Sequence, residues 1–280
     1  MTKIITTGNF KGGVGKTTNA VMFAYTFSKL GKRSLVVDLD PQANATDLIL
    51  TTINNVYQKK PVFKETLFEA IKEKDLSKSL INVKENMDLI PSYEDLQGYE
   101  KFLYSNFDND YSQDKYFSDL LKPLKSNYDY VVMDVPPQLN KFTDSALVAS
   151  DYVVVILQTQ ERSLKGAEKY IEHLLQLQDD YKLSLDLLGV LPVLQQNGSE
   201  LDLDVISDAI DSFGEQNLFK TKIKQMARLK RFDRTGITDN IKDINDRRVH
   251  EVYKTVVEEI FSRIKLLEAS NDWKNGTWSI

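Results

Sequence analysis

The residues most specific in type and spacing form a glycine-rich run near the start of the chain. In order they are Lys11, Gly12, Gly13, Val14, Gly15, Lys16, Thr17 and Thr18. An apolar, strand-like run precedes them and an amphipathic helical pattern follows, which is the context of a phosphate-binding loop. Glycines let backbone N–H groups surround phosphate oxygens, and a helix N-terminus adds partial positive charge. We therefore expect this run to bind a nucleoside triphosphate, with Lys16 on the β- and γ-phosphates and Thr17 on Mg²⁺.

The loop departs from the common form G-x-x-x-x-G-K-T at its first position. Phe10 stands where that form has glycine, and a second lysine, Lys11, stands directly before the paired glycines. A lysine so close to the start of the loop is poorly placed to reach its own nucleotide. We expect Lys11 to reach a nucleotide held by a second copy of the chain. There it would neutralise charge developing on the γ-phosphate, as an arginine finger does.

Three carboxylates follow strand-like runs and complete a hydrolytic site. Asp134 ends the run that begins at Tyr130, and we expect it to hold Mg²⁺ through water. Asp38 ends another run and is assigned to positioning Mg²⁺ or a switch segment, while Asp40 orients the attacking water; these two roles are interchangeable. Because ligands of open α/β sheets gather at the carboxyl ends of the strands, the acids and the loop should share one edge. The expected catalytic residues are Lys11, Lys16, Asp40 and Asp134, and the expected metal-binding residues are Thr17, Asp38 and Asp134.

The elements that must position these residues are short, almost continuously apolar runs separated by longer helical patterns. Such runs are typical of parallel strands that are covered on both faces. The runs are Lys3–Thr7, Ser34–Asp38, Met87–Pro91, Tyr130–Asp134, Tyr152–Leu157 and Leu187–Pro192. Their alternation with helices predicts an α/β fold, with a doubly wound, mostly parallel sheet flanked by helices. We expect a single domain over residues 1–280, with a variable insertion at about 51–125 and a loose tail at 270–280.

The composition excludes several classes of protein. The chain has 36 basic and 41 acidic residues, a net charge of −5, which excludes a wholly basic nucleic-acid binder. It has no cysteine, which excludes disulfides, thiolate zinc sites and Cys-ligated iron–sulfur clusters. No apolar run approaches the ~20 residues of a membrane helix, and the N-terminus has no signal-peptide pattern. We therefore expect a cytoplasmic protein.

Two segments depart strongly from the average charge. Residues 220–234 carry seven basic side chains and one acidic side chain, a net of +6. Residues 85–119 carry nine acidic and two basic side chains, with aromatic residues interspersed. We interpret the acidic segment as amphipathic helices and loops, with a partner surface as the alternative. The basic segment is either a solvated face or a surface for DNA phosphates.

Five motifs occur together along the chain. They are KGGVGKTT at 11–18, VDLDPQANAT at 37–46, LIPS at 89–92, YVVMDVPP at 130–137, and a T-x-I-x4-R-L-x6-G pattern at 221–236. With them the chain resembles the ParA-type DNA-partition ATPases of the ParA/MinD class, which have a deviant Walker A loop. The resemblance implies a P-loop ATPase that forms an ATP-dependent homodimer, with Lys11 acting across the interface.

The same resemblance implies further partners and a location. Non-specific DNA would be bound through Arg228, Lys230, Arg231 and Arg234. Hydrolysis would be slow until a ParB-like centromere-binding protein stimulates it, and the protein would associate with the nucleoid in the bacterial cytoplasm. One departure is that Lys224 and Gln225 stand where relatives often have Pro-Arg near the adenine. The base contacts at 224–227 are therefore left open.

Two alternatives to a partition ATPase remain at this point. A MinD-like ATPase that cycles on a membrane would use a C-terminal amphipathic helix with a basic polar face. The helical pattern from Val252 to Leu267 opposes its apolar side with glutamates, so we expect it to pack on the domain and expect no membrane partner. Trp273 and Trp278 beyond it are either an interfacial anchor or part of the tail. The other alternative is a nucleotide-dependent switch with negligible turnover.

Overall fold

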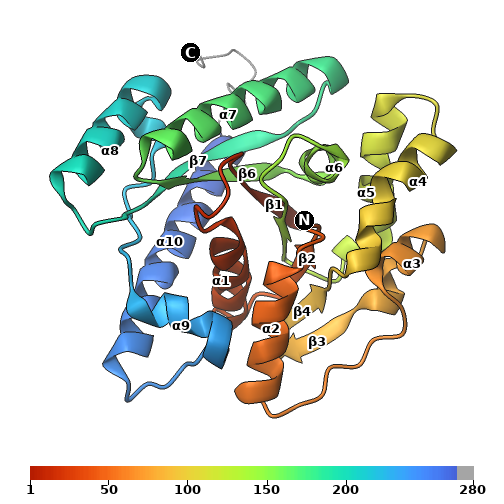
Figure 1. Ribbon diagram of the computed structural model, residues 1–280, viewed down its shortest axis with the longest axis horizontal. Coiled ribbons are helices and arrows are strands. Elements are labelled where there is room, and N and C mark those ends of the chain that lie inside the picture. The colour runs from red at the N-terminus through yellow and green to blue at the C-terminus, as the bar shows by residue number, and fades with distance from the viewer. Residues whose placement is uncertain (270–280) are drawn as a thin grey trace.

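A seven-stranded sheet forms the centre of the computed structural model, which describes residues 1–269 (Figure 1). Its strands are β1 (Lys3–Gly8), β2 (Ser34–Asp38), β3 (Ile81–Lys84), β4 (Met87–Ile90), β5 (Tyr130–Asp134), β6 (Tyr152–Gln158) and β7 (Asp186–Val193). Their order across the sheet is β3-β4-β2-β5-β1-β6-β7, and every neighbouring pair is parallel except β3 with β4. The predicted α/β fold with a mostly parallel sheet is confirmed, and all six predicted strands are present.

The edge strand β3 was not predicted from the sequence. It has only four residues, in which buried Ile81 and Val83 alternate with the more exposed Asn82 and Lys84. A tight turn connects it to β4, and Asn86 in that turn has a φ of 62°, a left-handed conformation that asparagine tolerates. The antiparallel hairpin therefore closes one edge of a sheet that is otherwise parallel.

Helices cover both faces of the sheet. They are α1 (Lys16–Lys29), α2 (Asn44–Asn55), α3 (Leu67–Lys72), α4 (Tyr99–Asn106), α5 (Asp110–Lys125), α6 (Lys141–Ala149), α7 (Glu161–Tyr181), α8 (Glu200–Phe213), α9 (Ala227–Thr235) and α10 (Ile244–Ala269). Successive strand side chains point to opposite faces. Accordingly, Val36 of β2 packs in the cluster formed with α1, α2, α9 and α10, whereas Leu35 and Val37 pack with α3 to α6. Figure 1 shows α1 between α10 and α2, with α4 and α5 at the opposite side of the molecule from α8.

The aromatic residues of the acidic segment lie mainly inside the fold. Tyr99 of α4 and Phe117 of α5 are fully buried, and Tyr116 is nearly so. Two tyrosines, Tyr104 and Tyr111, remain 60% and 41% exposed. The segment therefore contains the amphipathic helices that were predicted, and most of its aromatic rings stabilise the packing between α3, α4 and α5.

The last described helix, α10, packs on the domain as predicted. Val256, Val257 and Ile260 are completely buried in the cluster that includes α1, and Phe261 stacks on Phe27 of α1. No helix within residues 1–269 is long and apolar enough to cross a membrane. Trp273 and Trp278, and the tail predicted at 270–280, lie outside the described residues.

Candidate nucleotide-binding site

The carboxyl ends of three neighbouring strands meet at one level of the sheet. Thr7 of β1 is in register with Asp134 of β5, and Asp134 is in register with Asp38 of β2. The glycine-rich loop leaves β1 directly after this level and leads into α1. The predicted loop and the predicted carboxylates therefore share one edge of the sheet.

The loop takes a conformation that depends on its glycines. Gly13 and Gly15 have φ values of 76° and 96°, in the left-handed region that side chains with a Cβ rarely adopt. Asn9, buried just before the loop, stabilises its start: its Oδ1 accepts from the backbone N–H of Lys11 at 2.8 Å, and its Nδ2 donates to the carbonyl of Ile156 at 2.8 Å. This brace was missed in the sequence, where a lone asparagine carries no signal.

A cleft of about 600 Å³ opens above the loop. It is lined by Gly12, Gly13, Gly15, Lys16, Thr17, Thr18, Asp40, Gln42, Asn44, Asp47, Leu48, Val135, Pro137 and Asp233. Most of the predicted ATP-binding residues line it, as does the predicted catalytic Asp40. Val14 instead lines an adjoining cavity, and Lys11 lines neither of the two. The arrangement leaves room for a triphosphate between the loop and the segment that follows β2.

Lys16 is a buried cation within a group of acids. It begins α1 and is only 6% exposed, and its Nζ donates to the carbonyl of Lys11 at 3.4 Å. Burial lowers the pKa of Lys16, while the nearby charges of Asp134 and Asp40 oppose that shift. A lysine held this way presents a fixed positive charge to an anion in the cleft.

The side chain of Lys11, unlike that of Lys16, does not face the cleft. Its Nζ donates to the carbonyl of Gly12, 2.8 Å away, and so folds back on its own loop. It does not line the cleft of its own chain. The action of Lys11 across a subunit interface stays a prediction.

Asp134 is a buried carboxylate whose charge is only partly compensated. It is fully buried, and neither of its oxygens forms a hydrogen bond of normal geometry in the described part of the chain, although the Thr17 hydroxyl and the Lys16 ammonium lie close enough to favour its charged form. Burial, with the neighbouring charge of Asp38, raises its pKa to about 8. Since a buried carboxylate with only partial compensation is costly, the group fits a cation supplied from outside the chain. Mg²⁺ takes few protein ligands beside phosphate oxygens, so one carboxylate and a hydroxyl such as that of Thr17 could hold it at this place.

Asp38 and Asp40 have different surroundings in the structure. The Oδ2 of Asp38 accepts from both the backbone N–H and the hydroxyl of Thr46, each at 2.8 Å, and its Oδ1 accepts from the backbone N–H of Asp40. Burial raises the pKa of Asp38 to about 7. Asp40 lines the cleft, whereas Asp38 does not. Of the two roles predicted for Asp38, holding the segment between β2 and α2 therefore has more support than binding Mg²⁺.

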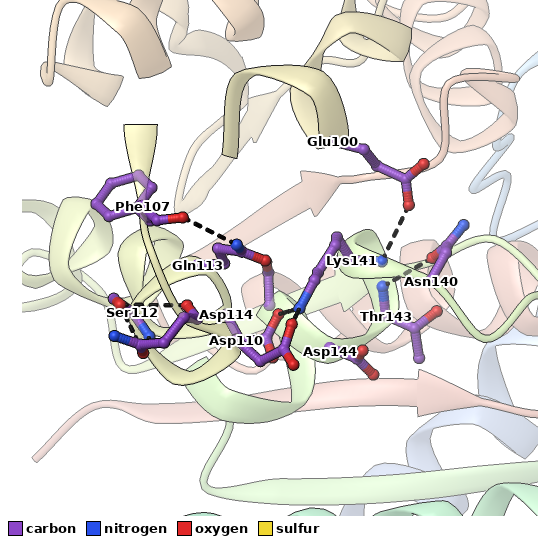
Figure 2. A network of polar contacts seen from close by, with 12 residues as sticks. Glu100, Phe107, Asp110, Ser112, Gln113, Asp114, Asn140, Lys141, Thr143 and Asp144 are labelled. Carbon is purple, nitrogen blue, oxygen red and sulfur yellow. Dashed lines mark hydrogen bonds and ion pairs between the residues drawn. The ribbon is translucent and has the colours of Figure 1, made fainter. Parts of the chain in front are cut away.

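The segment that follows Asp134 is anchored at its far end by Lys141, the first residue of α6. Figure 2 shows the Lys141 Nζ between Asp110 and Asp114 of α5, at 2.8 and 3.0 Å. The backbone N–H of Lys141 donates to Glu100 of α4 at 3.1 Å. The Lys141 side chain is only 8% exposed, so the pair with Asp114 is shielded from water. Nothing local in the sequence indicated Lys141, because its partners come from helices earlier in the chain.

A second cavity of about 200 Å³ adjoins the cleft. Apolar side chains, among them Leu194, Ile223 and Leu229, line much of it. Lys224, Gln225 and Met226 also line it, so the segment whose base contacts were left open lies beside the glycine-rich loop. A cavity that combines apolar walls with polar side chains, next to a phosphate loop, is a suitable place for a flat heteroaromatic base.

The four predicted DNA-binding residues lie on α9, but in two different situations. Lys230, Arg231 and Arg234 are exposed. Arg228 instead forms ion pairs with Asp243 and with the buried Asp246, and its side chain is 17% exposed. Its charge is therefore largely compensated within the chain. Arg248 of α10 is exposed and lines the same groove as Arg231, so it adds a further cation beside those of α9.

Comparisons with known proteins agree with this geometry. A family model described as an AAA domain matches residues 2–187. The sporulation initiation inhibitor protein Soj of Bacillus subtilis is 32% identical over 260 residues, which are 93% of this chain and 98% of Soj. The chromosome-partitioning ATPase Soj of Thermus thermophilus is 30% identical, over 93% of this chain and 96% of that protein. Cobyrinic acid a,c-diamide synthase of Mycobacterium smegmatis, solved with an ATP analog and magnesium, has a TM-score of 0.75 and 25% identity, over 95% of this chain and 96% of its own. The likeness therefore extends over nearly the whole chain.

Proposed function

The chain belongs to the ParA/Soj family of partition ATPases, and from this premise we propose that it is an ATP-dependent switch that binds non-specific DNA as a homodimer. The observation that carries the proposal is the cleft, which gathers Lys16, Thr17 and Asp40 next to the buried, only partly compensated carboxylate of Asp134. The family provides the context of plasmid or chromosome segregation, in the bacterial cytoplasm and on the nucleoid.

Within one subunit, the residues divide the work on ATP. Backbone N–H groups of the loop and the Lys16 ammonium hold the phosphates, and the second cavity holds the base. Thr17 and Asp134 hold Mg²⁺, with Asp38 keeping the neighbouring segment in place. The ion, when bound, supplies positive charge to the phosphate oxygens. Asp40 orients the water that attacks the γ-phosphate, and hydrolysis stays slow until a ParB-like centromere-binding partner acts.

Across two subunits, Lys11 links the nucleotide to dimer formation. The γ-phosphate is the one part of ATP that both the loop of the binding subunit and the Lys11 of the facing subunit would contact. Hydrolysis therefore removes the contact between this phosphate and Lys11, which favours the dimer. DNA release follows, because the basic faces of two subunits bind DNA more strongly together than one face does alone.

The Lys11→Ala variant tests this cross-subunit role. We expect ATP affinity within about twofold of the original, since Lys11 does not line the cleft, but loss of the ATP-dependent dimer and at least about tenfold slower hydrolysis. Light scattering after size exclusion, with and without ATP, gives the oligomeric state, and calorimetry gives the affinity. A variant that still dimerises and hydrolyses ATP normally would contradict the role, and a variant that loses ATP affinity would place Lys11 on its own nucleotide.

The DNA-binding part is tested by measuring affinity for random-sequence duplex DNA with ATP, with ADP and without nucleotide, over a salt series. Binding is expected with ATP alone. If Lys230, Arg231 and Arg234 of one subunit engage phosphates, log K falls by roughly 2.7 for each tenfold rise in salt, and by about twice that for two subunits. A DNA affinity that is the same with ATP, with ADP and without nucleotide would contradict the proposal, and so would an affinity that does not change with the salt concentration. The protein is expected not to sediment with lipid vesicles in the presence of ATP. Sedimentation with the vesicles would favour the MinD-like alternative.

A further inference from the structure

The two cavities beside the glycine-rich loop meet at a junction that α9 helps to form. Four residues line both cavities: Gly13, Gly15, Thr18 and Asp233. Three of them belong to the loop and the start of α1, and Asp233 comes from α9. In a nucleoside triphosphate the sugar connects the base to the phosphates. A nucleotide with its phosphates in the cleft and its base in the second cavity therefore places its ribose at this junction.

Asp233 is an acidic residue in a strongly basic segment. It is the one acidic residue of segment 220–234, which carries seven cations. Even so, its carboxylate forms no hydrogen bond or ion pair with any other described residue. Asp233 is exposed on the side that faces the two cavities' junction, and its partial desolvation there raises the pKa of its carboxylate, with no cation or hydrogen-bond donor to oppose the shift. Such a group is stabilised by a ligand that donates hydrogen bonds.

The parts of a nucleotide differ in what they offer to a carboxylate. Phosphate oxygens only accept hydrogen bonds from groups around them and repel a negative charge. The exocyclic amine of adenine donates, but it lies at the far side of the base from the sugar. The 2′- and 3′-hydroxyls of ribose donate and lie between base and phosphates, and a carboxylate is the group that binds ribose hydroxyls in dinucleotide-binding folds.

Building on the nucleotide site put forward above, we propose that Asp233 accepts hydrogen bonds from the ribose hydroxyls and so determines the preference of the site for ribonucleotides. The carboxylate gains the partners that the chain itself does not supply. Helix α9 then contacts the nucleotide through Asp233 and presents Arg231 and Arg234 to solvent.

The test measures dissociation constants of the full chain with Mg²⁺ for ATP, 2′-deoxy-ATP, 3′-deoxy-ATP and inorganic tripolyphosphate. The original protein is expected to bind ATP about tenfold or more tightly than the deoxy analogues, which is typical of hydrogen bonds to a charged group. Asp233→Asn is expected to bind ATP about as weakly as the deoxy analogues. It should bind tripolyphosphate equally or more tightly, because a negative charge near the phosphates is gone. The control is Asp208→Asn, an exposed acid of α8 that lines neither cavity and should change none of the four constants.

Three results would overturn the assignment. If Asp233→Asn weakens all four ligands by one factor, Asp233 supports the fold of the site and does not bind the sugar. If the original protein binds ATP and its deoxy analogues equally while binding tripolyphosphate, the phosphate site stands and the ribose contact does not. If it binds neither ATP nor tripolyphosphate, the nucleotide site fails, and the ribose contact with it.

Discussion

Replacing Lys16 with glutamine is expected to weaken ATP binding by at least about a hundredfold and to reduce hydrolysis to background. The lysine is buried at the floor of the cleft, where its positive charge is weakly screened by water. Losing one partner of a buried charge contact costs about 2–5 kcal/mol, and a hundredfold corresponds to about 2.7 kcal/mol. Calorimetry with ATP and a phosphate-release assay measure the two effects.

A matched comparison separates lost binding from lost folding. Lys16 also lies near Asp134 and Asp40, so its removal leaves those acids less compensated. The thermal midpoint of Lys16→Gln without nucleotide therefore has to be measured beside that of Lys11→Ala, whose lysine is nearer the surface. If Lys16→Gln is folded and still binds ATP as the original protein does, the cleft is not the triphosphate site.

Reversing the two exposed arginines of α9, as Arg231→Glu with Arg234→Glu, is expected to weaken ATP-dependent DNA binding by about a hundredfold at physiological salt. Each arginine is exposed and lines neither nucleotide cavity, so ATP binding should be unchanged. Loss of two phosphate contacts in each subunit should also reduce the salt dependence of log K by roughly 1.8 per subunit, or about 3.6 for a dimer that binds with both faces. Fluorescence anisotropy with labelled duplex DNA measures both quantities.

The control for that variant reverses two exposed lysines elsewhere, Lys101 of α4 and Lys122 of α5. It changes the net charge by the same amount, so equal losses of DNA affinity in both variants would mean that the total charge acts and not a face on α9. Arg228 is deliberately left intact. Its ion pairs with Asp243 and Asp246 would be broken by reversal, and lost DNA binding could then follow from a disturbed fold.

Much of the site was predictable because its signals are local in the chain. The glycine-rich run has to carry its own conformation, and each strand that ends in an acid is a short, continuous apolar run. These runs pair in parallel, and the register brings Asp38 and Asp134 to one level. Strand type and the edge that holds the site then follow from general rules for α/β folds.

The structural roles that the sequence did not reveal depend on contacts between segments far apart in the chain. Asn9 braces the loop through Ile156. Lys141 is buried by acids of α5, and Arg228 is compensated by Asp243 and Asp246. A lysine or arginine in a sequence has the same appearance whether it meets solvent or a buried carboxylate. Charge counting therefore located the basic segment but did not separate its exposed cations from its paired one.

Helix α9 is only nine residues, or about 13 Å, long, yet it borders the nucleotide cleft and carries the exposed cations. If both ligands bias the position of this one helix, their binding energies are linked, and linkage is reciprocal. Whatever factor ATP adds to DNA affinity, DNA must add to ATP affinity. The nucleoid would then act as an effector of the nucleotide site, retaining ATP on subunits that are already on DNA.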